Sequence, residues 1–209
     1  MTESNYSYAT PQYWDTQATD FDDEPDHGLR DPAVRDAWRD LLSEWLPPPP
    51  VTILDIGCGT GSLSLLLVEL DHRVVGSDWS LGMIARARAK VTAAGRAAHF
   101  FVMDATAPAL ASGLFDVVLC RHLLWALPDP ALALRRWAQL LVPGGQLVLI
   151  EGYWHTGGGL RAGKIIQELP PWMDNMKVMD LSQQAGLWGG EVSDERYIVV
   201  AQSGMLPPA

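Results

Sequence analysis

Three glycines alternate in one short segment of the sequence, Asp55-Ile56-Gly57-Cys58-Gly59-Thr60-Gly61. This segment follows an apolar, β-branched run at 51–56, which is typical of a buried parallel strand. Glycine permits positive φ angles and lets the backbone approach a ligand closely. Open parallel sheets bind their ligands where the strands end. A tight turn without a ligand is the alternative, but such a turn does not need three glycines, so we expect a ligand here.

The loop does not fit a pyrophosphate. A dinucleotide-binding loop has the pattern G-x-G-x-x-G, and its third glycine is replaced by Ser62 when the count starts at Gly57, or by Ser64 when it starts at Gly59. No Gly-Lys-Ser/Thr sequence of a phosphate-binding P-loop follows either. Instead, Asp55 precedes the first glycine. A carboxylate at this place is poorly suited to a pyrophosphate and compatible with a ligand that carries an ammonium and a sulfonium group.

Two further acids follow predicted strands. Asp78 lies 21 residues after Gly57, the distance at which one βαβ unit returns an acid to the glycine loop. Asp78 could instead cap the helix predicted at 81–94, but Ser80 is better placed for that role. Asp104 stands in the sequence Asp-Ala-Thr, which also fits an ordinary turn. Both acids are therefore candidate ligand-binding residues with a structural alternative.

Strands and helices alternate from residue 51 onward. A regular β-α-β-α series predicts a parallel sheet with helices on both faces and right-handed crossovers. A helix at 31–46, started by Asp-Pro, precedes it, and Pro47 to Pro50 form a stiff connector. The predicted strands are 51–56, 72–77, 98–103, 115–120, 146–151 and 197–202, with 175–180 as a neighbour of the last; the predicted helices are 62–70, 81–94, 130–141 (ended by Pro143-Gly144-Gly145) and 160–169.

These motifs resemble those of class I S-adenosylmethionine-dependent methyltransferases, of the small-molecule kind related to the ubiquinone and menaquinone methyltransferases. The resemblance covers about residues 51–151 and is weaker in the stretch YWD…FDDEPDHG. It implies an α/β fold, a Rossmann-like, seven-stranded, mostly parallel sheet with helices on both faces and an antiparallel last strand. It also implies three parts of one domain: an acidic arm and helix covering the site (1–50), the cofactor-binding core (51–151), and an acceptor-side insert with the C-terminal strands (152–209).

The resemblance implies that S-adenosyl-L-methionine is the cofactor. LDIGCGTG (54–61) would wrap its methionine portion, Asp78 would accept from the ribose hydroxyls beside Trp79 at the adenine, and Asp104-Ala105 would lie at the adenine edge. LVPGGQLVL (141–149) corresponds to the turn and strand that close the parallel sheet. No metal is expected. The expected cofactor-binding residues are Asp55, Gly57, Cys58, Gly59, Gly61, Asp78, Trp79, Met83, Asp104, Ala105 and Arg121.

Methyl transfer mainly requires that a nucleophile be held in line with the methyl carbon. A general base is needed only for an acceptor that is protonated near neutral pH. His122 follows the fourth strand, His155 follows the fifth, and His27 lies in the acidic arm; each is a candidate base or acceptor contact, with a structural role as the alternative. Arg121 could hold the cofactor through its backbone, or a substrate carboxylate through its side chain.

Aromatic side chains and methionines gather after the fifth strand. Tyr153, Trp154, Trp172 and Trp188, with Met173, Met176 and Met179, either line a pocket for a planar, apolar acceptor or bury a small C-terminal core. The resembled family usually has a full helix and two long strands here, whereas this chain offers one short helix and a glycine-broken stretch. The topology after residue 152 is therefore open, as are a dimer contact and a mobile lid.

The composition of the chain limits the kinds of binding partner that we expect. The 209 residues carry a net charge of −10, and residues 1–46 hold eleven acids against three arginines. Nucleic acid is therefore an unexpected partner, because its binding needs Lys and Arg. The acidic segment is either a solvated arm or a lid over a cationic ligand. No apolar run reaches the roughly 18–20 residues of a membrane span, and no secretory signal is visible. Cys58 and Cys120 are expected as reduced thiols in a cytoplasmic protein.

The leading hypothesis is a methyltransferase that acts on a small-molecule acceptor, either aromatic or a secondary metabolite, as a monomer or homodimer. A second hypothesis is a non-catalytic S-adenosylmethionine-binding module. A third is an NAD(P)-dependent reductase, against which the missing third glycine and the lack of a Tyr-x-x-x-Lys pair both count.

Overall fold

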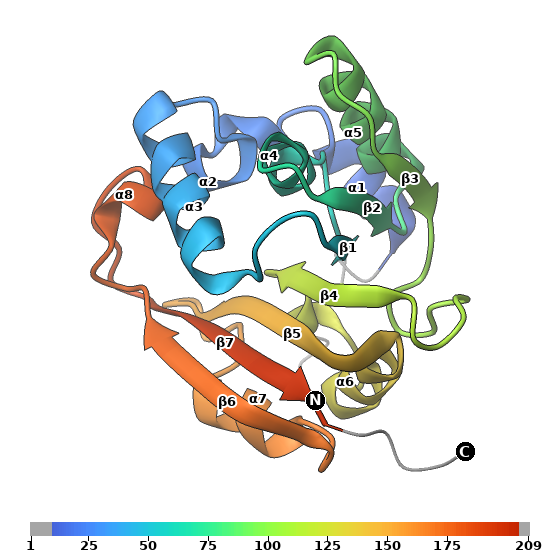
Figure 1. The fold of residues 1–209 in the computed structure, drawn as a ribbon. Helices are drawn as coiled ribbons and strands as arrows, with labels where there is room; N and C mark the ends of the chain where they lie inside the picture. The colour runs from blue at the N-terminus through green and yellow to red at the C-terminus, as the bar shows by residue number, and fades with distance from the viewer. Residues whose placement is uncertain (1–9, 205–209) are drawn as a thin grey trace.

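A seven-stranded sheet forms the centre of the computed structural model, which describes residues 10–204 (Figure 1). Residues 1–9 of the predicted arm, Glu3 among them, and residues 205–209 lie outside the described residues. The strands are β1 (Thr52–Ile56), β2 (Arg73–Asp78), β3 (His99–Val102), β4 (Phe115–Arg121), β5 (Leu141–Tyr153), β6 (Met173–Asp180) and β7 (Glu195–Ser203). The helices are α1 (Pro11–Gln17), η1 (Phe21–Asp23), α2 (Pro25–Gly28), α3 (Pro32–Trp45), α4 (Ser62–Glu69), α5 (Leu81–Ala93), η2 (Leu124–Ala126), α6 (Pro130–Gln139), α7 (Ala162–Glu168) and α8 (Ala185–Trp188).

The strand order is β3-β2-β1-β4-β5-β7-β6. The pairs from β3 to β5 are parallel, and β7 pairs antiparallel with both β5 and β6. The predicted fold class is thereby confirmed. Strand order reverses between β1 and β4, and ligands of open α/β sheets bind at such a switch point, outside the carboxyl ends of the strands. Those ends of β1, β2, β4 and β5 therefore define where a site belongs.

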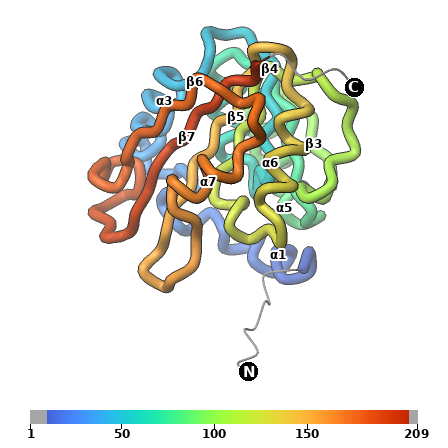
Figure 2. The backbone as a smooth tube through the Cα atoms, turned by 90° about the horizontal axis from the view of Figure 1, so that it is seen from below, coloured from blue at the N-terminus to red at the C-terminus, as the bar shows by residue number. Residues whose placement is uncertain are grey.

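Helices cover both faces of the sheet (Figures 1 and 2). Because successive strand residues point to opposite faces, Ile53 packs with α3, α4 and α8, whereas Leu54 packs with α6 and α7. The central strands are buried on both sides, which explains their unbroken apolar sequences. None of the described helices has the combination of length and apolar character that crossing a membrane requires.

Three short elements precede the predicted helix α3 and were missed by the sequence-based prediction. α1, η1 and α2 contain only seven, three and four residues, too few for a helical period to show. α3 begins as predicted, since the Asp31 carboxylate accepts from the N–H groups of Ala33 and Val34.

Two expectations for the C-terminal half were wrong in detail. Pro143-Gly144-Gly145 does not end a helix, because α6 already ends at Gln139 and these residues belong to β5, where its pairing with β4 is irregular. The aromatic insert is not one cluster either. Trp172 and Met173 pack on the α6 and α7 side of the sheet, while Trp188 packs on the α3 side. The sheet itself separates them.

Trp38 ties α3 to α8 across the core. Its ring is fully buried, and its Nε1–H donates to the Leu187 carbonyl at 2.8 Å. We expect Trp38→Phe to lower the free energy of unfolding by about 1–3 kcal/mol, because a buried carbonyl loses its donor. Urea denaturation measures this change. Trp45→Phe is the matched control, since the Trp45 Nε1–H has no hydrogen-bond partner among the described residues; equal losses in both variants would contradict the prediction.

Candidate functional site

The glycine loop joins β1 to α4 at the switch point. Gly57, Gly59 and Gly61 adopt φ angles of 74°, 54° and 77°, which only glycine adopts without strain. A Cβ atom on Gly57 would lie 2.5 Å from the Leu123 side chain, so a larger residue would also force that side chain to move. The N–H groups of Gly57 and Cys58 donate to the Ser77 carbonyl at 2.8 and 2.9 Å, which attaches the loop to β2.

Asp78 at the end of β2 faces this loop. Its carboxylate accepts from the Gly59 N–H at 3.0 Å and from the Ser80 N–H at 2.9 Å. Burial raises its pKa, and these hydrogen bonds oppose that rise. The Ser80 hydroxyl caps α5 by accepting from the Met83 N–H, as predicted. The Asp78 oxygens keep further lone pairs, so the carboxylate can accept additional donors from a ligand.

Asp55 is enclosed at the end of β1. Its carboxylate is 2% exposed and accepts from the Ser64 hydroxyl at 2.5 Å, which ties β1 to α4. Burial raises its pKa to about 6, and both the Ser64 hydrogen bond and the Arg121 charge oppose that shift. At neutral pH the Asp55 carboxylate is therefore mostly ionised and places a negative charge next to the glycine loop.

The predicted adenine-side residues lie beyond β2 and β3. Trp79 is half-buried and Met83 is buried on α5. Asp104 is exposed, and its Oδ1 accepts from both the N–H and the hydroxyl of Thr106 at 2.8 Å. These are the contacts of an ordinary turn, the alternative considered for this residue. The Ala105 carbonyl accepts from Trp137 Nε1. A role at the adenine edge stays a prediction for Asp104 and Ala105.

The acidic arm lies against the glycine loop. The Phe21 ring stands over Gly59, 3.2 Å from where a Cβ atom would be. The Asp22 carboxylate accepts a hydrogen bond from the Thr60 hydroxyl and forms an ion pair with Lys90 at 2.8 Å. Both contacts were missed by the sequence analysis, because no local pattern links residues so far apart in the chain.

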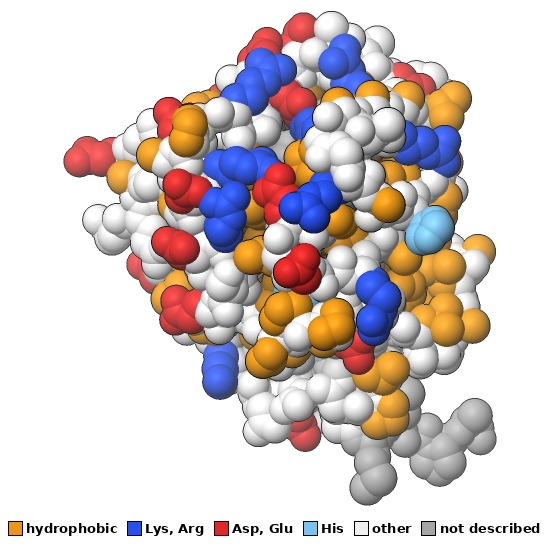
Figure 3. All heavy atoms as spheres, turned by 45° about the horizontal axis from the view of Figure 1, so that its top comes forward, with side chains coloured by type: hydrophobic (Ala, Val, Ile, Leu, Met, Phe, Trp, Pro, Cys, Tyr) orange, Lys and Arg blue, Asp and Glu red, His pale blue; other side chains and the backbone are white. Residues whose placement is uncertain are grey.

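Asp15 gives the arm a second attachment. Its carboxylate accepts from the Ser80 hydroxyl at 2.6 Å and from the Gly82 N–H at 2.8 Å, and these hydrogen bonds lower its pKa. Asp23, in contrast, is exposed and pairs with Arg30. Part of the acidic segment therefore binds the core and part faces solvent. Acidic and basic side chains are interspersed on the face shown in Figure 3.

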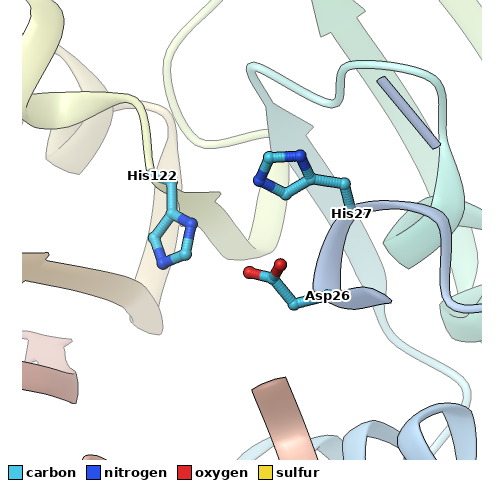
Figure 4. A group of neighbouring side chains, drawn as sticks. All are labelled: Asp26, His27 and His122. Carbon is cyan, nitrogen blue, oxygen red and sulfur yellow. The ribbon is translucent and has the colours of Figure 1, made fainter. Parts of the chain in front are cut away.

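Two of the three predicted histidines come together. His27 lies on α2, His122 follows β4, and the Asp26 carboxylate points between their rings (Figure 4). One potential ligand atom from each of the three residues lies within 4.8 Å of the others. The segments that carry them are distant in the sequence and meet only because the arm folds over the carboxyl end of the sheet.

Aromatic rings hold both imidazoles in place. His27 stacks on Phe21 with centroids 4.3 Å apart, and His122 lies edge-on to Trp154 at 5.5 Å and near-parallel to Trp188 at 6.0 Å. Burial lowers the pKa of His27, and it lowers that of His122 well below the usual value, with the Arg121 charge adding to both shifts. Both imidazoles are therefore neutral at pH 7.

Arg121 and His155 have different surroundings. The Arg121 guanidinium donates to the Asp26 carbonyl and lies over the Trp38 ring, 5.0 Å from its centroid. It therefore attaches α2 to the core. The His155 side chain is 77% exposed and its Nδ1 lies 3.1 Å from Asp194. The structure does not bring His155 to the other two histidines, and its catalytic role stays a prediction.

Glu151 is a site residue that the sequence analysis missed. It ends the apolar run of β5 and is fully buried. Its Oε1 accepts from the N–H groups of Leu123 and Leu124 at 3.0 and 2.7 Å, which fixes the segment that follows His122. Burial raises its pKa to about 8. An acid at the end of an apolar strand, as Asp55 also is, was the available signal.

Glu151 makes stability depend on pH. Between 4.5, the ordinary pKa, and about 8, the folded chain keeps a proton that the unfolded chain has lost. The free energy of unfolding should therefore fall as pH rises through this window, by at most about 1.4 kcal/mol per pH unit. Glu151→Gln keeps the shape and cannot titrate, so it should gain stability relative to the unmodified protein as pH rises. Urea denaturation from pH 5 to 8 tests this. Glu191→Gln, at an exposed position, is the control, and parallel pH profiles for all three proteins would refute the assignment.

Comparison with known proteins agrees with this geometry. Residues 54–149 match the methyltransferase domain family. A demethylmenaquinone methyltransferase of Thermus thermophilus is 38% identical over 108 residues, which cover 51% of this chain and 49% of the relative. A ubiquinone biosynthesis O-methyltransferase of Pseudomonas aeruginosa is 32% identical over 152 residues, which cover 68% of this chain and 64% of the relative. The chain thus spans between about half and two thirds of these relatives.

Solved structures show the same fold. The [4+2]-cyclase SpnF superposes with a TM-score of 0.71 at 20% identity, covering 81% of this chain and 80% of that one. The N-methyltransferase NodS of Bradyrhizobium japonicum, in complex with S-adenosylhomocysteine, superposes with a TM-score of 0.66 at 21% identity, covering 88% and 90%. The family match and the relatives contradict the alternative of an NAD(P)-dependent reductase. Residues 54–149 therefore carry a methyltransferase domain, and over this segment the chain is similar to class I S-adenosylmethionine-dependent methyltransferases.

Proposed function

We propose that this protein transfers a methyl group from S-adenosylmethionine to a small-molecule acceptor. The observation that carries the proposal is the placement of the Asp78 carboxylate against the glycine loop, at the sheet edge where His27 and His122 also meet. A cofactor site and two neutral imidazoles thereby share one end of the sheet.

The loop fits this cofactor better than a nucleotide phosphate. The N–H groups of Gly57 and Cys58 donate to Ser77, and that of Gly59 donates to Asp78. Because these N–H groups already donate to other groups of the protein, they do not point at a phosphate as the N–H groups of a P-loop do. The remaining ligand-binding groups are acids: Asp55 supplies negative charge near a bound cation, and Asp78 can accept from a ribose diol. When bound, S-adenosylmethionine supplies a methyl carbon activated by its sulfonium.

The chain's own residues would orient the acceptor and receive its proton. The aromatic rings of Phe21, Trp154 and Trp188 flank the two histidines and suit a planar, apolar molecule. A neutral His122 or His27 can accept a proton from an acceptor hydroxyl, amine or thiol. The arm, attached through Asp15 and Asp22, would exclude water from the reacting groups.

An acceptor route is available next to Trp154. A surface depression of about 370 Å³ is lined in part by Tyr153, Trp154 and His155. The Trp154 ring also packs against His122, with ring centroids 5.5 Å apart. We infer that an acceptor enters here, so His155 would contact it at the entrance rather than at the methyl group.

The cysteines, the surface charges and the exposed edge strand bear on the location, the partner and the assembly of the protein. Both cysteines are unpaired, which supports a cytoplasmic location. The mixed charges on the face of Figure 3 support a small molecule rather than nucleic acid as the partner. Edge strand β6 exposes Met176 and Val178, which a homodimer would cover.

The first experiment is calorimetric titration with S-adenosylmethionine, S-adenosylhomocysteine and NADH. Binding of the first two in the micromolar range without binding of NADH supports the proposal. Failure of both to bind would refute it. Turnover with a panel of phenols, amines and thiols then separates an enzyme from a module that binds the cofactor without methyl transfer.

Asp78→Ala should weaken S-adenosylmethionine binding by about 1.5–3 kcal/mol, the range of hydrogen bonds to a charged group. This corresponds to a dissociation constant raised roughly ten- to hundredfold. Asp116→Asn is the control, since Asp116 accepts from the Thr52 N–H at the opposite end of the sheet. Circular dichroism verifies that both variants fold. An unchanged dissociation constant in folded Asp78→Ala would remove the ribose assignment.

A further inference from the structure

Asp26, His27 and His122 bring potential ligand atoms from two distant segments of the chain together. One such atom from each residue lies within 4.8 Å of the others. In Figure 4 one nitrogen of each imidazole ring is turned toward the Asp26 carboxylate. Two ring nitrogens and a carboxylate oxygen therefore surround one point, as the ligands of a metal ion do.

The positions of these groups are fixed independently of any ligand. His122 has a φ angle of 54°, in the left-handed region that is uncommon for a residue with a side chain. Its ring is held between Trp154 and Trp188, and the following residues are held by Glu151. These contacts hold the His122 ring in one orientation.

We propose that Asp26, His27 and His122 bind a divalent transition-metal ion of the zinc class, with at least one coordination position left open. Two imidazoles and one carboxylate form the ligand set of many open zinc sites.

The present spacing is close to that of a metal site. Ligand atoms about 2.0–2.2 Å from a tetrahedral ion lie about 3.3–3.6 Å from one another. The observed limit of 4.8 Å requires an inward movement on the order of 1 Å. α2, which carries Asp26 and His27, is a four-residue helix on the arm, and a small shift of it would close the site (Figure 4).

Nearby charges are compatible with a cation. The Arg121 guanidinium lowers the pKa of both histidines, and Asp22, Asp26 and Asp55 all attract it. Arg196, whose charge also acts on His122, pairs with Asp194.

No metal motif is visible in the sequence, because Asp26 and His27 lie far from His122 along the chain and only the fold brings them together. If the proposed function holds, the open position lies where an acceptor oxygen would coordinate. Metal binding itself does not depend on that function.

The test is metal binding by the full chain without cofactor or acceptor. After treatment with a chelator and dialysis, the protein is titrated with Co²⁺ under visible spectroscopy and with Zn²⁺ by calorimetry, and bound metal is counted by mass spectrometry. We expect one ion per chain, and a zinc-dependent rise in the melting temperature.

Three variants remove one ligand each: Asp26→Asn, His27→Asn and His122→Asn. Asparagine tolerates the left-handed backbone at position 122. Each should weaken binding at least tenfold. His155→Asn is the matched control, because this exposed histidine lies outside the cluster, and it should bind like the unmodified chain. Circular dichroism monitors folding, and the two variants on the arm keep the test valid if His122→Asn unfolds.

Absence of stoichiometric binding would overturn the proposal. So would binding that persists unchanged in His27→Asn and Asp26→Asn, since that result would place the ion elsewhere, for example at Cys58. Because no step of this test involves methyl transfer, failure of the proposed function leaves its outcome interpretable.

Discussion

Asp78 accepts a hydrogen bond from the Gly59 N–H, and this contact joins the two halves of the first βαβ unit at the place where a ligand would bind. The Ser77 carbonyl, one residue earlier, receives the N–H groups of Gly57 and Cys58. The loop can follow this path only because its glycines adopt positive φ. The geometry of the site thus depends on the register between β1 and β2, and the packing of the apolar sheet fixes that register.

The second half of the site depends on long-range contacts. The arm reaches the core through Asp15, Asp22 and the Asp26 carbonyl, whose partners lie at and on α5, on the glycine loop and at the end of β4. Exposed ion pairs contribute little to stability, but the Asp22–Lys90 pair is largely enclosed. The arm and the sheet edge therefore form one unit, and His27 takes its position from both.

Much of the core could be predicted from the sequence because its signals are local. The strand at 51–56, the glycine loop, the Ser80 cap and the position of Asp78 all follow from patterns within one βαβ unit. The Asp22–Lys90 ion pair and the proximity of His27 to His122 could not be predicted, because the sequence around each partner does not indicate the contact. The short arm helices lack a period, and the separation of Trp172 from Trp188 follows from alternation across a sheet whose last strands were not placed in advance.

Titratable groups that are costly to bury gather at one end of the sheet. Asp55 lies near the end of β1, Arg121 ends β4 and Glu151 lies near the end of β5. Burial raises the pKa of both acids and lowers that of Arg121, so in each case it favours the neutral form. Such groups destabilise a fold unless they are paired. The opposite ends of these strands carry ordinary structural contacts, such as Asp116 to Thr52. Since stability alone favours apolar residues at these positions, the asymmetry is best explained by a binding function at the carboxyl edge.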